Sequence, residues 1–339
     1  MRRLVAALAG FLVLASSADA FAEQRLAEDL SVSLTPIPFF PRDPAVREFG
    51  TLKLLGSYRL ASEHSAFGGF SGLVMAGDGS RLVAVSDDGW WFGATVERKD
   101  GAITGLSKAR IAPLLDAEGK RPRSKIHRDA EALAPWDAGG IDGRLIVGFE
   151  RDERVAVYDV GAQGFAARPR LVPSPKAISE GPENGELEAV GRLFEAPFEG
   201  WLIAVSESHF DPDGNTRGWL WKGSRTVPLK LKRHGDYRVT DLAILPGGRS
   251  MVTVERSFVP PLSLGMTIRR FELKDLEAGA PAEGELLLEA RWPGHTIDNM
   301  EAIAAWPRPE GGVVLTVLSD DNYNRSIQRT LLLEFVLLP

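Results

Sequence analysis

One unit of sequence recurs along this chain and constrains its fold more than any other feature. The unit opens with a short apolar run headed by an acid, passes through a turn rich in Gly or Pro, and continues into a second apolar run that ends in an acid. The two acids stand at one identical spacing in three instances: Glu131 and Glu150, Glu188 and Glu207, and Glu301 and Asp320. Such a recurrence indicates an array of similar structural units.

Two further instances depart from this pattern. Asp241 leads to Glu255 over a shorter interval, and Ser71 stands where the other units have an acid, ahead of Asp87. The five opening positions, residues 71, 131, 188, 241 and 301, follow one another at nearly equal intervals. Two more strand-like runs follow each pair of apolar runs except the last, which is followed by one. Four antiparallel strands in an interval of this length are typical of a propeller blade.

The two ends of the repeated region predict how the ring closes. The last unit has no fourth strand after the run from Gln328 to Leu337, whereas the run from Thr51 to Leu60 precedes the first unit. Pairing these two runs would remove an exposed sheet edge. We therefore expect an all-β fold, a propeller of five four-stranded blades. Six blades would need a further unit that the sequence does not supply, and a pair of β-sandwiches is the alternative architecture.

The N-terminus has the pattern of a secretory signal peptide. Arg2 and Arg3 form a positive region, residues 4–15 are apolar, and small residues allow cleavage after Ala20 or Ala22. We expect residues 1–20 to be this signal, so that the mature protein is periplasmic or secreted.

Composition narrows the classes of function. The chain has no cysteine, which excludes disulfides, thiolate nucleophiles and cysteine-ligated zinc. Its net charge of −6 gives no support to a nucleic-acid partner, which would favour a basic patch. No stretch beyond the leader is long and apolar enough to span a membrane. We expect residues 21–49 to form an N-terminal extension and residues 50–339 the propeller domain.

Strand geometry predicts that the repeated acids gather at one mouth of the ring. In an antiparallel pair, the start of the first strand and the end of the second lie at the same sheet edge. Period-two alternation adds Asp129 and Glu186 to that side. The nine repeated acids are Asp87, Glu131, Glu150, Glu188, Glu207, Asp241, Glu255, Glu301 and Asp320.

So many carboxylates need compensation. Two unit charges about 4 Å apart repel by about 4 kcal/mol at an effective dielectric of about 20. The ring must therefore bind cations, pair with arginines or hold protons. Oxygen ligands without cysteine favour calcium, or magnesium with bound waters, over softer metals. The predicted metal ligands are Asp87, Glu150, Glu188, Glu207, Asp241, Glu255, Glu301 and Asp320.

Other residues of the same ring are candidates for further roles. Glu131, Glu188 and Glu301 are candidates for catalysis. The arginines Arg128, Arg151 and Arg256 adjoin the repeated acids and could bind an anionic substrate. A purely structural role is the alternative: buried polar residues at strand ends can fix blade against blade, with Glu150 beside Arg151 and Glu255 beside Arg256 as such pairs.

A set of short motifs occurs in order along the repeated region. They are Gly69-Phe-Ser71-Gly-Leu, Ser86-Asp-Asp-Gly89, Asp129-Ala-Glu131-Ala-Leu-Ala, Phe149-Glu-Arg151, Val254-Glu-Arg-Ser-Phe258, Ile297-Asp-Asn-Met-Glu301 and Ser319-Asp-Asp-Asn322 followed by Gln328-Arg-Thr-Leu-Leu. Together, over about residues 50 to 337, they resemble the bacterial phytase-like proteins, whose domain is named "esterase-like activity of phytase". The resemblance implies a secreted β-propeller that hydrolyses phosphoric or other esters. It also implies calcium, because propeller phytases hold calcium ions in an acidic mouth.

Two functions follow as expectations. The first is a metal-dependent hydrolase of small phosphoric or carboxylic esters, in which calcium polarises the ester and activates water. The alternative is a non-catalytic periplasmic binding or scaffold propeller with structural calcium. An enzyme unrelated to esters, such as a lactonase, is a third reading.

Overall fold

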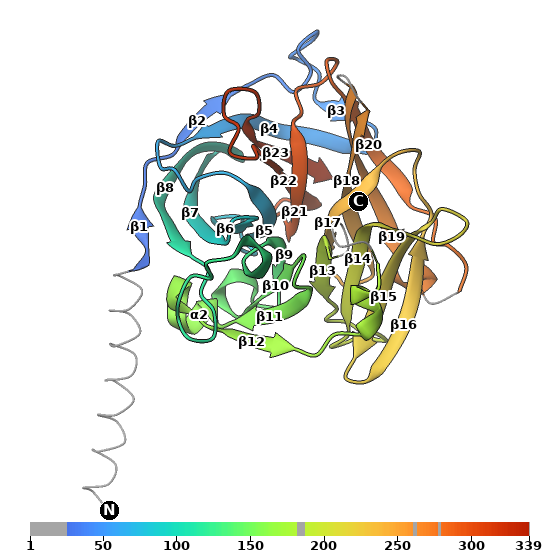
Figure 1. Ribbon diagram of the computed structural model, residues 1–339. Helices are drawn as coiled ribbons and strands as arrows, with labels where there is room; N and C mark the ends of the chain where they lie inside the picture. Colours follow the sequence, from blue (N-terminus) through green and yellow to red (C-terminus); the bar gives the residue numbers. More distant parts are fainter. Residues whose placement is uncertain (1–25, 182–186, 260–262, 277–278, 339) are drawn as a thin grey trace, which may run out of the picture.

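Five antiparallel sheets are arranged in a ring around a central channel (Figure 1). This computed structural model describes residues 26–181, 187–259, 263–276 and 279–338. The prediction of a five-bladed, all-β propeller is confirmed. The predicted signal peptide and Glu186 lie outside the described residues.

Each blade is built from four strands that follow one another outward from the channel, and the innermost strands of neighbouring blades pack against one another. Blade 1 contains β5 (Phe70–Met75), β6 (Arg81–Ser86), β7 (Trp90–Lys99) and β8 (Ala102–Pro113). Blade 2 contains β9 (Ala130–Pro135), β10 (Leu145–Phe149), β11 (Arg154–Tyr158) and β12 (Pro169–Val172). Blade 3 contains β13 (Ala189–Arg192), β14 (Leu202–Phe210), β15 (Thr216–Lys222) and β16 (Arg225–Leu231).

The last two blades follow the same plan. Blade 4 contains β17 (Arg238–Ile244), β18 (Ser250–Val259), β19 (Ser263–Glu272) and β20 (Glu285–Arg291). Blade 5 contains β21 (Asn299–Pro307), β22 (Val313–Asp320), β23 (Thr330–Leu337) and β4 (Leu52–Ala61). Helical segments are short: α2 (Val160–Gln163) and the 3₁₀ turns η1 (Lys125–His127), η2 (Gly140–Asp142), η3 (Gly164–Ala166), η4 (Lys176–Ser179) and η5 (Leu273–Asp275). In the described part of the chain, no helix has the length and apolar character to cross a membrane.

The ring closes by pairing the two ends of the repeated region, as predicted. Strand β4 lies antiparallel beside β23, with Leu60 opposite Thr330 at one end (Figure 1). A buried ion pair joins the first and last blades, because both guanidinium Nη atoms of Arg98 on β7 donate to Glu334 on β23 at 2.7 Å. Glu334 is fully buried. Blades 1 and 5 are thus joined by charge as well as by apolar packing.

The N-terminal extension covers two outer edges of the disc. The short strands β1 (Glu28–Asp29) and β2 (Ser33–Pro36) pair with β8 and β4, the outermost strands of blades 1 and 5, and β3 (Glu48–Phe49) pairs with β4. Covering an outer strand removes a template for pairing with another chain. The apolar cores lie between blades, where large side chains such as Trp91 and Phe165 stack with ring centroids 5.8 Å apart.

The connections between strands lie on two opposite faces of the disc. The turns between second and third strands, and the links from one blade to the next, lie on one face, which we call the mouth face. The turns between first and second strands and between third and fourth strands lie on the opposite face, called the far face. The mouth face carries the longest connections, including the one from β8 to β9.

Candidate functional site

A β-bulge at the mouth end of the innermost strands decides which side chains reach the channel. The pairing register shifts by one position there in four blades, leaving one residue unpaired. In blade 3, β13 begins directly after Glu188, which holds the same place. A bulge re-aims the side chain of its extra residue. The residues at these five positions are Ser71, Glu131, Glu188, Thr240 and Glu301.

Two of these positions carry hydroxyl groups rather than acids. Ser71 donates to the carbonyl of Ala130, and Thr240 donates to the carbonyl of Met300 at 3.0 Å. Each hydroxyl therefore ties its blade to the next. The three remaining positions carry the glutamates predicted as candidates for catalysis.

The predicted place of Asp241 in the ring is wrong. Its carboxylate accepts from the backbone N–H of Leu242 and of Ile303, each at 2.8 Å, and is fully buried between blades 4 and 5. Because the bulge lies at Thr240, Asp241 falls one position too late, and a one-residue shift turns a side chain to the opposite face of a strand.

The same shift moves Glu255 out of the ring. Glu255 pairs with Val239, as Phe149 pairs with Ala130 in blade 2, so the ring position belongs to the following residue, Arg256. Glu255 instead faces the outer strands. Its carboxylate lies 2.7 Å from a guanidinium nitrogen of Arg269 on β19, and the side chains are 1% and 5% exposed. The predicted pairing of Glu255 with its neighbour Arg256 is therefore corrected to a pairing with Arg269.

Arg256 balances one side of the ring. Its guanidinium lies 2.9 Å from Glu207 and 3.1 Å from Glu301, and it also donates to the side chain of Asn299. Burial lowers the pKa of Arg256, but the carboxylates of Glu301 and Glu207 outweigh burial and raise it. This arginine stays charged and is already engaged with two acids.

Lys125 and Arg151 balance the other side. Lys125, in η1 between blades 1 and 2, places Nζ 2.5 Å from Asp87 and 3.1 Å from Asp129. Arg151 places Nε 2.6 Å from Asp129, whose side chain is only 1% exposed. Carboxylate oxygens of Asp87, Asp129 and Glu131 lie within 4.8 Å of one another, which is compact enough to hold a metal ion.

The acids of this site repel one another strongly. We call the following set the acidic mouth: Asp87, Asp129, Glu131, Glu150, Glu188, Glu207, Glu301 and Asp320. Burial raises the pKa of Glu131 well above its ordinary range, and the neighbouring charge of Glu188 adds to this rise. Burial also raises the pKa of Glu188 well above its ordinary range, and the charges of Glu207 and Glu150 add to this rise.

Two further acids of the mouth titrate near neutrality. Burial raises the pKa of Glu301 to about 7, with Arg256 opposing the rise and Glu207 adding to it. Burial raises the pKa of Asp320 to about 8, and the charge of Asp87 contributes. The cations present therefore do not neutralise the mouth, which would take up protons or a further cation.

The predicted substrate-binding arginines all lie beside acids. Arg128 pairs with Asp88 at 2.7 Å, and Arg121 pairs with the same carboxylate at 2.6 Å. Sequence reasoning missed Lys125 and Arg121. Both lie in the run 120–128, where five of the nine positions carry Lys or Arg, so a local signal was present.

Comparison with known protein families matches the region that contains the five repeated units. A family model described as "Phytase-like: Esterase-like activity of phytase" matches residues 65–323. No curated protein matches the chain at a significant level.

Similar solved structures include one titled "Structure of U3-55K", with a TM-score of 0.40 and 11% identity over 84% of this chain and 98% of that one. "Crystal structure of RRP9 WD40 repeats" gives 0.40 and 10% over 85% and 99%. "Crystal structure of Nidogen/Laminin Complex" gives 0.39 and 11% over 79% and 87%.

Proposed function

Since the chain belongs to the phytase-like family, we propose that it is an exported, calcium-dependent hydrolase of small phosphoric or carboxylic esters. The observation that carries this proposal is the acidic mouth, where carboxylates from four blades meet with too few cations to neutralise them. The N-terminal pattern of Arg2, Arg3 and the apolar residues 4–15 supports export to the periplasm or beyond.

The donor set fits a hard cation. Asp87, Asp129 and Glu131 would hold one calcium ion, because their oxygens already lie within 4.8 Å of one another and calcium takes oxygen ligands. Lys125 would have to leave Asp87 and Asp129 as the ion enters. The neighbouring acids Glu150, Glu188, Glu207 and Asp320 would complete this or a second site.

Bound calcium would polarise the ester and lower the pKa of a bound water. The chain's own groups would place the substrate and move protons. Glu301 suits proton transfer near neutral pH, because its pKa is about 7. Arg256 touches Glu301 and would orient it, and would bind an anionic group of the substrate after releasing Glu207.

A second function is favoured by one observation. Arg128, Arg151 and Arg256 are each engaged in an ion pair with an acid. A non-catalytic periplasmic propeller with structural calcium would need no free arginine, so this remains the competing proposal.

One experiment separates the two functions. The mature protein would be assayed on 4-nitrophenyl phosphate and 4-nitrophenyl butyrate, with calcium and with a chelator. Ester hydrolysis predicts turnover that the chelator abolishes and calcium restores. Glu301→Gln should lower it by about 100-fold or more. Glu310→Gln, which changes an exposed glutamate on the far face, should leave it unchanged.

The other outcomes are equally informative. Calcium binding by calorimetry without turnover of either ester would favour the non-catalytic function. Neither binding nor turnover would overturn both. Fractionation of cells that express the full chain tests export, and protein that stays in the cytoplasm with its N-terminus uncleaved would contradict it.

A further inference from the structure

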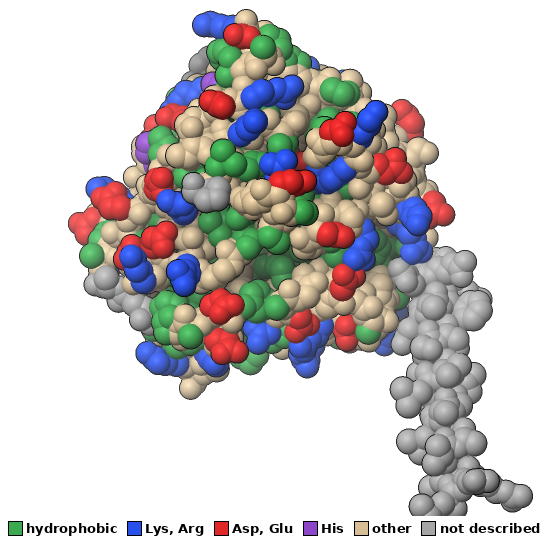
Figure 2. All heavy atoms as spheres, turned by 180° about the vertical axis from the view of Figure 1, so that it is seen from behind, with side chains coloured by type: hydrophobic (Ala, Val, Ile, Leu, Met, Phe, Trp, Pro, Cys, Tyr) green, Lys and Arg blue, Asp and Glu red, His purple; other side chains and the backbone are tan. Residues whose placement is uncertain are grey.

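A pocket opens at the end of the channel opposite the acidic mouth. Its volume is about 380 Å³, and residues from all five innermost strands line it together with the turns of the far face. Figure 2 shows the molecule from behind, with a hollow lined by hydrophobic side chains near the centre of the disc. Ligand sites in proteins are typically concave, mostly apolar and about 300–1,000 Å³ in volume.

A layer of aliphatic side chains separates this pocket from the mouth. Each innermost strand contributes one residue, two positions after its mouth residue, and each is at most 2% exposed. The layer consists of Leu73, Leu133, Val190, Leu242 and Ile303. Two residues of strand rise about 7 Å. We call this pocket the cup. None of the acids of the mouth lines it, so a ligand in it would not touch them.

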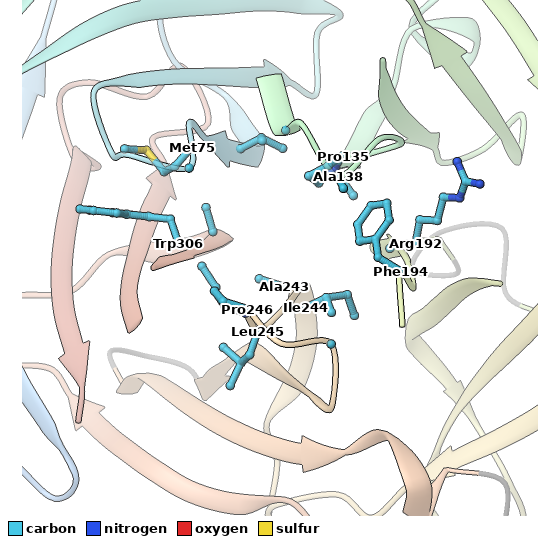
Figure 3. Close-up of a pocket in the computed structure, with 18 of the residues that line it drawn as sticks. Met75, Pro135, Ala138, Arg192, Phe194, Ala243, Ile244, Leu245, Pro246 and Trp306 are labelled. Atoms are coloured by element: carbon cyan, nitrogen blue, oxygen red, sulfur yellow. The ribbon is translucent and has the colours of Figure 1, made fainter. Parts of the chain in front are cut away.

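Aromatic side chains on opposite sides form part of the wall. Figure 3 shows Trp306 and Phe194 across the pocket from each other, with Ala243 and Ile244 between them. Trp306 is held in place, because its indole N–H donates to Thr316 at 3.1 Å and the guanidinium of Arg98 lies 4.8 Å from its ring centroid. A fixed wall lowers the entropic cost of binding.

The charged side chains of the lining are directed to partners at the rim. Asp137 accepts from Arg144 at 2.7 and 2.9 Å. Arg192 donates to the carbonyl of Trp136 at 2.7 Å and lies 4.2 Å from the centroid of that indole ring. Glu195 is exposed at the edge. Among the residues that the structure describes, those that line the interior of the pocket are thus apolar. The pocket therefore suits an uncharged group.

We propose that this cup binds a neutral apolar small molecule, or the apolar end of a larger one. At about 30 Å³ for a group the size of a water molecule, the volume accommodates about a dozen non-hydrogen atoms. This activity lies beyond ester hydrolysis at the mouth. Because the aliphatic layer separates the two ends, binding in the cup should not depend on calcium.

Calorimetric titration of the mature protein with 1-naphthol and with 1-octanol tests the proposal. We expect one site with a Kd of about 1 mM or tighter and a negative heat-capacity change, in calcium and in chelator alike. Ala243→Phe, which fills the centre of the cup, should weaken binding at least tenfold. A large side chain at Ala243, on the innermost strand β17, can also disturb folding. Ala138→Trp, at the exposed rim, therefore provides a second variant that blocks the cup.

The matched control is Ala162→Trp, at an exposed position on α2, outside the pocket lining. It should bind both probes like the parent. Absence of saturable binding by the parent protein would overturn the proposal. Unchanged affinity in Ala138→Trp and in a folded Ala243→Phe would overturn it as well, since the probes would then bind elsewhere.

Discussion

The pairing of Glu255 with Arg269 offers the sharpest test of the register at the mouth. Arg269 holds Glu255 through two guanidinium nitrogens, at 2.7 and 2.8 Å, and donates to the carbonyl of Lys232 at 2.8 Å. Thr253 and Thr267 donate to the same carboxylate at 2.9 and 3.3 Å. We consider Arg269→Met, which keeps the bulk of the side chain and removes its charge.

The expected loss of stability is large. Removing one partner of a buried ion pair leaves an uncompensated charge and costs about 3–5 kcal/mol. With about 2.1 cal/mol/K of unfolding entropy per residue, the 339 residues give about 0.7 kcal/mol/K. The melting temperature should fall by about 4–7 °C. Arg269→Met combined with Glu255→Gln should recover much of this loss, because no buried charge is left alone.

Unfolding by guanidinium chloride and calorimetry, applied to both single variants and the double variant, measure these effects. Calcium affinity should not change in any of them, because Glu255 faces away from the mouth. A loss below about 1 kcal/mol, or additive effects of the two substitutions, would refute the buried pairing. A selective loss of calcium affinity in Glu255→Gln would restore Glu255 as a ligand.

Three further predictions follow from the charges. Glu301 and Asp320 have pKa values of about 7 and 8 in the folded protein, so they bind protons more tightly there than in the unfolded chain. Their contribution to stability is therefore complete below their ordinary pKa values of 4.5 and 3.8, and it is lost as the pH rises through 7 and 8. Urea midpoints in chelator should fall over that window and recover with calcium; a rise in chelator would contradict the assignment. Lys125→Met should tighten calcium binding at least tenfold by calorimetry, because the ammonium no longer competes for the carboxylates, and weaker binding would argue against a site there. Glu334→Gln should lower the free energy of unfolding by about 1–3 kcal/mol, because it weakens the ion pair that joins blades 1 and 5. Glu310→Gln, at an exposed position in blade 5, should change it by less than about 0.5 kcal/mol, and equal effects of the two would contradict a stabilising role of the ion pair.

Much of the fold could be predicted because its signals are local. The alternation of apolar residues and the turn residues mark each strand within a few positions, and the nearly regular recurrence of the acid-headed unit marks the blades. The pairing of residues 51–60 with the final strand followed from the need to satisfy both sheet edges.

The acidic mouth was predictable only in part. Glu131, Glu188 and Glu301 lie where the repeat placed them, since their blades share one spacing between the two acids. In blade 4 the shorter spacing from Asp241 to Glu255 concealed the bulge at Thr240. A register shift of a single position exchanges the two faces of a strand, so Asp241 lies outside the ring and Arg256 lies in it.

By itself, then, the sequence determined the number of blades, the closing strand and the face on which most acids gather, because period-two alternation acts over a few neighbouring residues. Only the tertiary structure decided which charges meet. Lys125 reaches Asp87 across 38 residues, and Arg98 reaches Glu334 across 236. The cup on the far face likewise exists only where five strands converge. These features depend on how blades pack, which no local pattern encodes.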